Sequence, residues 1–238
     1  MKENKTIHPE AHVINVNQKL NWLRASVLGA DDGIVSVAGI VVGVAGATNS
    51  TTIILAAGLA GLVAGAISMA AGEYVSVSSS RDTERALLEK ERYELKHYPE
   101  AELAELIAIY ERKGLSKKTA TIVAEELTRK DVFAAHVDAE LNIDPENLTS
   151  PSHAAFASAI SFLAGAVIPL AAIIIPPEPI RIPVAFASVI FALAITGVIS
   201  AQISGTNIIR ATGRVVAGGV LAMAVTYGIG RLFGVAGI

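Results

Sequence analysis

The sequence predicts an all-α membrane protein, with five transmembrane helices and a charged three-helix domain inserted between the second and the third. The 238 residues are 52% hydrophobic, and the mean hydropathy of +0.52 is high for a soluble domain. Charged residues make up only 17% of the chain, yet residues 78–142 hold 14 of the 22 acidic and 11 of the 19 basic side chains. Outside this block, five segments have the roughly 20 mostly apolar residues that a transmembrane helix needs.

The chain is expected to have four parts. A polar N-terminal segment (1–22) lacks the apolar core of a secretory signal. Transmembrane helices 1 and 2 occupy 23–77, the charged domain occupies 78–142, and transmembrane helices 3–5 occupy 143–238. The spans themselves are expected at 23–47, 52–77, 153–175, 183–203 and 207–233.

The charged block is expected to be helical throughout. Residues 81–97 contain no Gly or Pro, so span two is predicted to continue as one long helix into this block. Pro99 is placed to start a second helix that Gly114 ends. Ser116 is placed to cap a third helix, with a bend expected near Asp131.

Positive charge near the short loops predicts the orientation. Lys19 and Arg24 precede the first span, and the loop after it (48–51) has no Lys or Arg. This bias places the N-terminus and the charged block in the cytoplasm.

The absence of Cys excludes disulfides, thiolate zinc sites and iron–sulfur ligation, and the absence of a basic stripe argues against a nucleic-acid partner.

Four side chains in the first two spans predict an ion path through the membrane. They are Asp31, Asp32, Met69 and Glu73. An ionisable group at membrane depth is costly and marks an ion or proton path. A carboxylate near a thioether favours a transition metal over magnesium or calcium, and a carboxylate that binds a metal must first release its proton. For Met69 alone, simple packing is the more common explanation.

Pairs of carboxylates in the charged block predict a metal-binding domain. Two pairs of glutamates lie three residues apart, so each pair projects from one helix face, and a histidine and a glutamate on the third helix are placed to close the site. These residues are Glu91, Glu94, Glu102, Glu105, His136 and Glu140. Oxygen ligands suit divalent cations, and a nearby imidazole favours transition metals. The alternative is a solvated face whose glutamates pair with Lys90, Arg92 and Lys96.

A second alternative is a membrane-anchored ferroxidase. Glu94 and His97 match the Glu-x-x-His motif of di-iron carboxylate proteins. Such proteins need two of these motifs, and no other histidine in the chain has a glutamate three residues before it. The missing half-site weakens this interpretation.

Three long stretches closely resemble the vacuolar iron transporter family. They read LRASVLGADDGIVSVAGIVVGVAGA, GLVAGAISMAAGEYVSVSSSRDTERALLEKERYEL and PEAELAELIAIYERKGL, and the resemblance extends through the last span. It implies a five-span homodimer that exports ferrous iron from the cytosol in exchange for protons, along a path at the dimer interface lined by Asp32 and Met69, with Glu73 adjoining.

The same resemblance implies a cytoplasmic metal-binding domain between helices 2 and 3. Its two glutamate pairs match Glu91, Glu94, Glu102 and Glu105, and its later glutamate matches Glu140, with Glu126 as the other choice. The family has methionines near this last ligand, whereas this chain has His136 and Val137 there. The metal preference of the domain is therefore open.

The expected function is proton-coupled export of a divalent metal, Fe²⁺ first and Mn²⁺ next, with Co²⁺ and Zn²⁺ as further alternatives. No enzymatic activity and no prosthetic group are expected. The expected partners are a second copy of the chain, the lipid bilayer, metal ions and protons. A prokaryotic cell membrane is favoured because the N-terminus carries no evident targeting segment, and a vacuolar-type membrane applies if the protein is eukaryotic.

Overall fold

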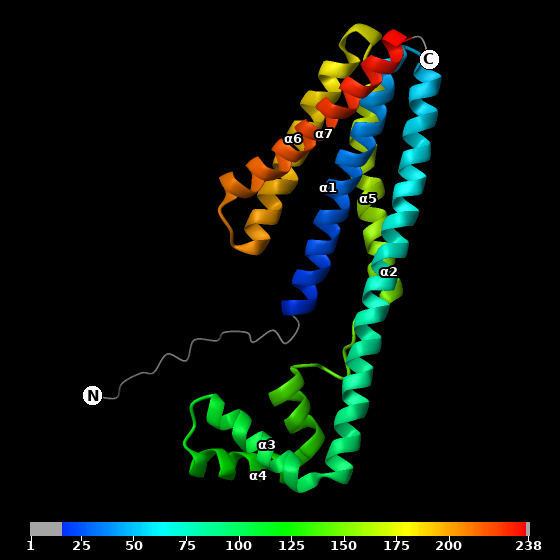
Figure 1. Ribbon diagram of the computed structural model, residues 1–238. Helices are drawn as coiled ribbons and strands as arrows, with labels where there is room; N and C mark the ends of the chain where they lie inside the picture. The colour runs from blue at the N-terminus through cyan, green and yellow to red at the C-terminus, as the bar shows by residue number, and fades with distance from the viewer. Residues whose placement is uncertain (1–15, 237–238) are drawn as a thin grey trace, which may run out of the picture. The chain divides into compact units, whose positions relative to one another are not determined.

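The computed structural model describes residues 16–236, and in this range the chain is all helical, as predicted (Figure 1). It forms seven α-helices and one π-helical turn. Their bounds are α1 Val16–Ala47, α2 Thr51–His97, α3 Pro99–Arg112, α4 Lys117–His136, η1 Val137–Leu141, α5 Pro151–Ile174, α6 Glu178–Ser204 and α7 Ile208–Ala236. Of the expected polar segment 1–22, residues 1–15 lie outside the described residues, and residues 16–22 already belong to α1.

Five of these helices are long and apolar enough to cross a membrane. The candidate spans are Ala25–Ala47, Thr51–His97, Pro151–Ile174, Glu178–Ser204 and Ile208–Gly234. This finding confirms the five predicted spans. The second helix has 47 residues without interruption, more than twice the roughly 20 that the hydrocarbon core requires. Its charged second half, beginning at Arg81, therefore lies outside the membrane-spanning part.

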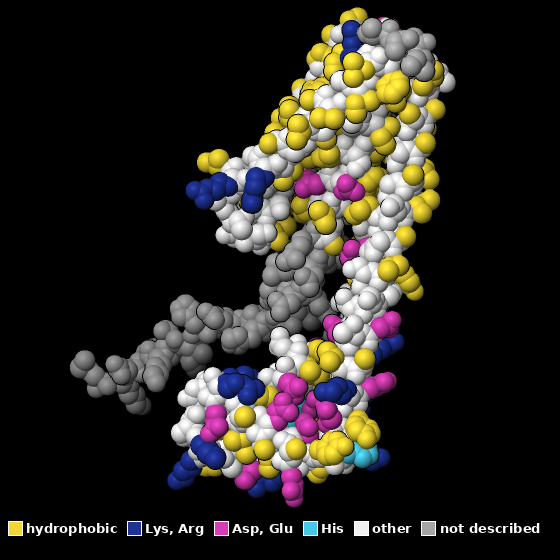
Figure 2. Space-filling model, viewed as in Figure 1, with side chains coloured by type: hydrophobic (Ala, Val, Ile, Leu, Met, Phe, Trp, Pro, Cys, Tyr) yellow, Lys and Arg dark blue, Asp and Glu magenta, His cyan; other side chains and the backbone are white. Residues whose placement is uncertain are grey.

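The chain divides into two compact units, with boundaries between Glu73 and Tyr74 and between Pro151 and Ser152. The unit that contains the five apolar segments is called the membrane unit below, and residues 74–151 are called the charged unit. Figure 2 shows acidic side chains gathered over the charged unit, whereas the visible face of the membrane helices is largely apolar. Each unit is described by itself.

Helix α1 lies at the centre of the membrane unit. It packs against α6 and α7, which also pack against each other. Val37, Ala38, Val41 and Val42 on α1 are fully buried. Their small, branched or short side chains let the surrounding helices approach closely, which matters because packing rather than hydrophobicity drives helix association in lipid.

Glycines make the closest helix contacts within the membrane unit. A Cβ atom on Gly33 of α1 would collide with the carbonyl oxygen of Phe162 on α5, and one on Gly165 of α5 would collide with the carbonyl oxygen of Ala30. The same relationship joins Gly230 of α7 to the carbonyl oxygen of Gly43 of α1. Backbones meet at these points because no side chain separates them.

The charged unit has a small core of its own. Leu106 of α3 and Ala124 and Ala135 of α4 are buried together. Ser116 caps α4 as predicted, since its hydroxyl accepts from the Thr119 amide at 3.3 Å. Gly114 ends the preceding helix with a φ of +100°, which a side chain would disfavour.

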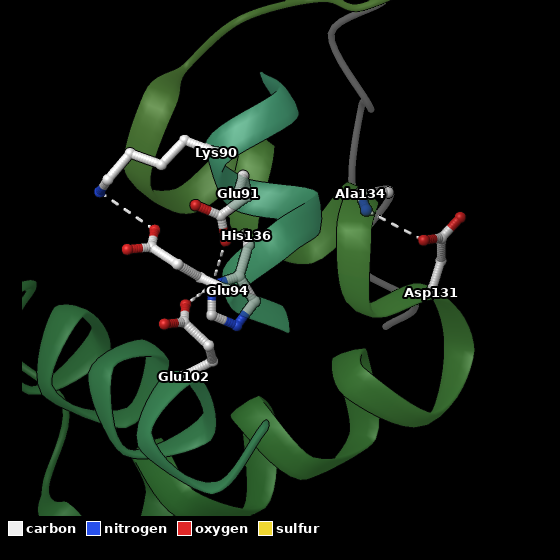
Figure 3. A network of polar contacts seen from close by, with 7 residues as sticks. All are labelled: Lys90, Glu91, Glu94, Glu102, Asp131, Ala134 and His136. Carbon is white, nitrogen blue, oxygen red and sulfur yellow. Dashed lines mark hydrogen bonds and ion pairs between the residues drawn. The ribbon is translucent and has the colours of Figure 1, made fainter. Parts of the chain in front are cut away.

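The bend predicted near Asp131 is confirmed. The backbone of this residue is extended (φ −164°, ψ 99°) within an otherwise helical stretch. Its carboxylate oxygen Oδ1 accepts from the Ala134 amide at 2.9 Å, so Asp131 acts as the N-cap of a new helical segment (Figure 3). This change of direction sets the position of His136, five residues later.

Candidate metal centre

Three buried side chains from three helices converge in the charged unit. Glu91 comes from α2, Glu102 from the first turn of α3, and His136 from the last turn of α4. One ligand atom from each lies within 4.8 Å of the others. In the described part of the chain, no other group of three His, Asp or Glu side chains meets this distance. We refer to these three residues as the Glu–Glu–His cluster.

The cluster is nearly closed to solvent. His136 is fully buried, and the exposed fractions of Glu91 and Glu102 are 3% and 7%. The Nδ1 atom of His136 lies 3.1 Å from Oε1 of Glu91 and 3.7 Å from Oε2 of Glu102. Figure 3 shows both carboxylates turned toward the imidazole ring.

These short distances do not amount to hydrogen bonding. Among the described residues, Oε1 of Glu91 and both ring nitrogens of His136 have no hydrogen-bond partner. The 3.1 Å contact has the length of an ion pair but not the angles of a hydrogen bond. Buried polar atoms are nearly always satisfied. Two carboxylates and an imidazole facing one another are the donors of a divalent-metal site.

Burial controls protonation in the cluster. The pKa of Glu91 is raised to about 7, chiefly by burial and then by the charges of nearby carboxylates. Burial also raises the pKa of Glu102, with the charges of Glu105 and Glu94 acting in the same direction. Burial lowers the pKa of His136, against the opposing charge of Glu105. Near neutral pH the imidazole is therefore uncharged, and Glu91 is poised to exchange a proton.

The other three predicted metal-binding residues lie around the cluster rather than in it. Glu94 forms an ion pair with Lys90, with Oε2 and Nζ 3.0 Å apart. Glu105 and Glu140 are exposed, yet the charges of both act on the pKa of Glu91. Glu126, the other choice for the fifth glutamate, is exposed on α4 and is not among the charges that act on Glu91.

The solvated-face alternative describes only part of this region. Lys90 does pair with Glu94. Arg92 instead places its guanidinium 4.4 Å from the centre of the Phe133 ring, a cation–π contact. The two most buried glutamates face the imidazole of His136 rather than a lysine or arginine, so they are not part of a solvated face.

The geometry does not favour the ferroxidase alternative. The His97 ring stacks on Tyr93 with ring centres 4.0 Å apart, and its Nδ1 lies 2.7 Å from the Tyr93 carbonyl oxygen. Neither Glu94 nor His97 belongs to the Glu–Glu–His cluster. A di-iron centre needs two Glu-x-x-His motifs, and the described charged unit offers one group of three ligands.

The four residues predicted to line an ion path all lie in the membrane unit. Asp32 is exposed in the single chain and accepts from the Ser36 hydroxyl at 3.0 Å. Asp31 is half-buried, as is Glu73, and Met69 packs against the edge of the apolar core. Within one chain, these carboxylates do not form a group of three ligands.

One residue near this path has no signal in the sequence. Thr196 of α6 lies close to the Asp31 carboxylate of α1, while its hydroxyl donates to the Leu193 carbonyl oxygen at 3.2 Å. The two residues are 165 positions apart, and an isolated threonine in an apolar span is unremarkable. Only the packing of α1 against α6 brings a polar side chain to Asp31.

The five spans define an integral membrane protein, and its charged unit holds a buried group of two carboxylates and an imidazole whose chemistry suits a divalent metal. A model of the VIT family matches residues 23–231. The chain therefore belongs to this family, and the resemblance seen in the sequence is confirmed.

Relatives of known name cover most of the chain. A "Vacuolar iron transporter" from Acanthamoeba castellanii is 45% identical over 212 residues, which cover 89% of this chain and 78% of that protein. "Vacuolar iron transporter homolog 1" of Oryza sativa subsp. japonica is 38% identical over 94% of this chain and 79% of its own length. "Vacuolar iron transporter homolog 2" of Arabidopsis thaliana is 34% identical over 99% of this chain and 96% of its own length.

Proposed function

We propose that the protein exports a divalent metal from the cytosol across the membrane in exchange for protons, with ferrous iron as the first choice of substrate and manganese as the second. The observation that carries the proposal is the buried Glu–Glu–His cluster in a chain of the VIT family. The named relatives are a vacuolar iron transporter and a homolog of that name, which supports iron as the cargo.

The donor set supports a transition metal. Carboxylate oxygens alone suit magnesium and calcium, whereas an imidazole nitrogen shifts preference toward iron, manganese, cobalt and zinc. His136 supplies that nitrogen from a fully buried position. We infer that the charged unit captures metal and passes it on, and that it holds no permanent prosthetic group.

Proton exchange follows from the same residues. A metal can bind Glu91 only when that carboxylate is ionised, and its pKa is about 7. Metal capture near neutral pH therefore displaces a proton from the fraction of Glu91 carboxyls that are protonated. In the membrane unit, Asp31, Asp32 and Glu73 are the groups proposed to carry metal and protons in turn, with the Met69 thioether as a further ligand.

The exposure of Asp32 supports a homodimer. A carboxylate on the lipid-facing surface of a span is costly, and Asp32 is exposed in the single chain with only Ser36 as its partner among the described residues. A second copy that covers this face of α1 makes the carboxylate part of a shared path. The charged unit is proposed to lie in the cytoplasm of a prokaryotic cell, or on the cytosolic side of a vacuolar-type membrane.

Proteoliposomes test this proposal directly. The full-length protein is reconstituted with an iron-sensitive dye and a pH-sensitive dye inside, and Fe²⁺ is added outside under reducing conditions. We expect iron to enter while protons leave, in protein-containing vesicles and not in empty ones. Iron entry without proton movement would refute the coupling, and the absence of iron entry would refute transport.

A further inference from the structure

A cavity in the charged unit, separate from the Glu–Glu–His cluster, has three arginines among its seven lining residues. Its volume is about 290 Å³, close to the lower end of small-molecule sites. The lining residues are Arg81, Arg85, Leu88, Arg92, Pro145, Glu146 and Leu148. Four of them come from α2, and the other three come from the segment before α5. No residue of the metal cluster is among them.

The spacing along α2 places the arginines on one face. Arg81, Arg85 and Arg92 follow one another by four and seven residues, so their side chains project from the same side of the helix. Leu88, between them, is only 4% exposed and forms an apolar floor. Like charges one helical turn apart repel each other, so a negative partner near Arg81 and Arg85 is stabilising.

The described cavity lining supplies one negative charge, that of Glu146. Among the described residues, no carboxylate oxygen lies within 4.0 Å of these arginines. Glu146 lines the cavity without forming such a pair, which leaves three guanidinium groups against one carboxylate. The Nε atom of Arg81 is buried and has no hydrogen-bond partner in the described chain. Buried donors of this kind are rarely left unsatisfied.

We propose that this cavity binds a phosphate group. A guanidinium presents a planar pair of donors that matches two phosphate oxygens, and clusters of arginine are the usual means of recognising phosphate. Three arginines against one glutamate leave an excess positive charge suited to a doubly charged anion. Arg92 also lies over the Phe133 ring, with its guanidinium carbon 4.4 Å from the ring centre.

The phosphate has two possible sources, a lipid headgroup or a soluble phosphate. Arg81 lies eight residues after Glu73 on the same helix, a rise of about 12 Å, soon after the apolar part of α2 ends. Basic side chains just beyond a membrane span are favoured sites for anionic lipids. The shared chemistry is the phosphate group, and the experiment separates the two sources.

The test uses the full-length protein in a neutral detergent. Short-chain phosphatidic acid, short-chain phosphatidylcholine and inorganic phosphate are titrated separately, with binding followed by calorimetry and by the thermal midpoint. The site variant is Arg81→Gln with Arg85→Gln. The control is Arg112→Gln with Arg129→Gln, which removes the same charge from exposed positions of the same unit outside the cavity lining.

We expect phosphatidic acid to bind the wild type and the control equally and the site variant at least about tenfold more weakly, because charge-assisted hydrogen bonds are lost. Arg81→Lys, which keeps the charge but not the planar donors, is expected to lose most of the affinity too. Binding of phosphatidic acid alone assigns the site to a lipid, and equal binding of inorganic phosphate assigns it to a soluble anion. Equal affinity of wild type and site variant for every probe, or no binding by the wild type, overturns the proposal.

Discussion

The Nδ1 atom of His136 lies 3.1 Å from Oε1 of Glu91, and both atoms are buried without a hydrogen-bond partner in the described chain. The pair joins the end of α4 to the last two turns of α2, 45 residues apart in the sequence. Glu102 approaches the same ring nitrogen from α3 at 3.7 Å. Since a divalent cation satisfies two carboxylates and an imidazole at once, this arrangement predicts how metal capture depends on sequence and on pH.

Replacing Glu91 and Glu102 together with glutamine is expected to weaken metal binding by at least about 10- to 100-fold, because two charged ligands are lost. Binding is measured on the full-length protein from the absorption bands of Co²⁺. Transport is expected to persist but to saturate at higher metal concentration, since the membrane path is intact. The control replaces Glu125 and Glu126, both exposed on α4, and should bind like the wild type. Unchanged Co²⁺ bands in the cluster variant would show that these glutamates are not ligands.

Metal binding to the charged unit is expected to strengthen as the pH rises through about 7, the pKa of Glu91. Below this pH the carboxyl holds a proton that the metal must displace, so affinity falls by up to about tenfold per pH unit. The sign is the same for His136, whose protonation also blocks its nitrogen. Calorimetry in buffers of different ionisation enthalpy gives the number of protons released per metal bound.

In the metal-free protein, the stabilising contribution of Glu91 to the fold falls as the pH rises, whereas the metal affinity increases. Because the folded-state pKa of Glu91 is raised from 4.5, its contribution to stability is fully present below pH 4.5 and is lost as the pH rises through about 7. Metal should therefore raise the thermal midpoint more on the alkaline side of this window than on the acid side. If the metal affinity does not change across pH 7 in either the wild type or Glu91→Gln, the assignment of this pH dependence to Glu91 is wrong.

The substitution Asp32→Asn is expected to abolish iron transport while leaving the fold intact. An amide keeps the shape of the side chain but neither binds a proton nor neutralises a metal ion, and Asp32 is exposed on α1 beside Ser36. Iron uptake is measured in proteoliposomes, and folding is checked by the thermal midpoint in detergent. Glu178→Gln, an exposed acidic residue in the first turn of α6, serves as the control with full activity. Undiminished flux through the Asn variant would remove Asp32 from the path.

The substitution Met69→Leu is expected to reduce transport of iron more than transport of manganese. Leucine keeps the apolar volume with which Met69 packs against the membrane core but lacks the sulfur atom, and sulfur contributes more to binding of the softer ion. Competition between the two metals in the same vesicles gives the ratio directly. An unchanged ratio would assign Met69 to packing alone.

The substitution Gly33→Ala is expected to destabilise the membrane unit by about 1–3 kcal/mol, because the new methyl group collides with the backbone of α5 at Phe162. The measurement is a lower thermal midpoint in detergent. Gly72→Ala is the matched control, since a Cβ atom there has open space in the described chain. Alanine is also the better helix former by about 1 kcal/mol, so the control should be as stable as the wild type or more so.

The sequence alone determined the elements of this protein. Five apolar stretches predicted the five spans because an apolar helix of sufficient length has few other stable environments. Local chemistry predicted the start of α3 at Pro99, the Ser116 cap and the bend at Asp131, since each depends on contacts within a few residues. The sequence also identified the glutamate pairs and His136 as candidate ligands.

Only the tertiary structure decided which of these candidates meet. Periodicity placed Glu91 and Glu94 on one face of α2 and could not rank them, whereas the fold buries Glu91 beside His136 and leaves Glu94 with Lys90. The proximity of Thr196 to Asp31 and the arginine-lined cavity likewise depend on segments distant in the chain. Burial and long-range contacts set these outcomes, because both arise when helices pack and neither is encoded in the spacing of residues along one helix.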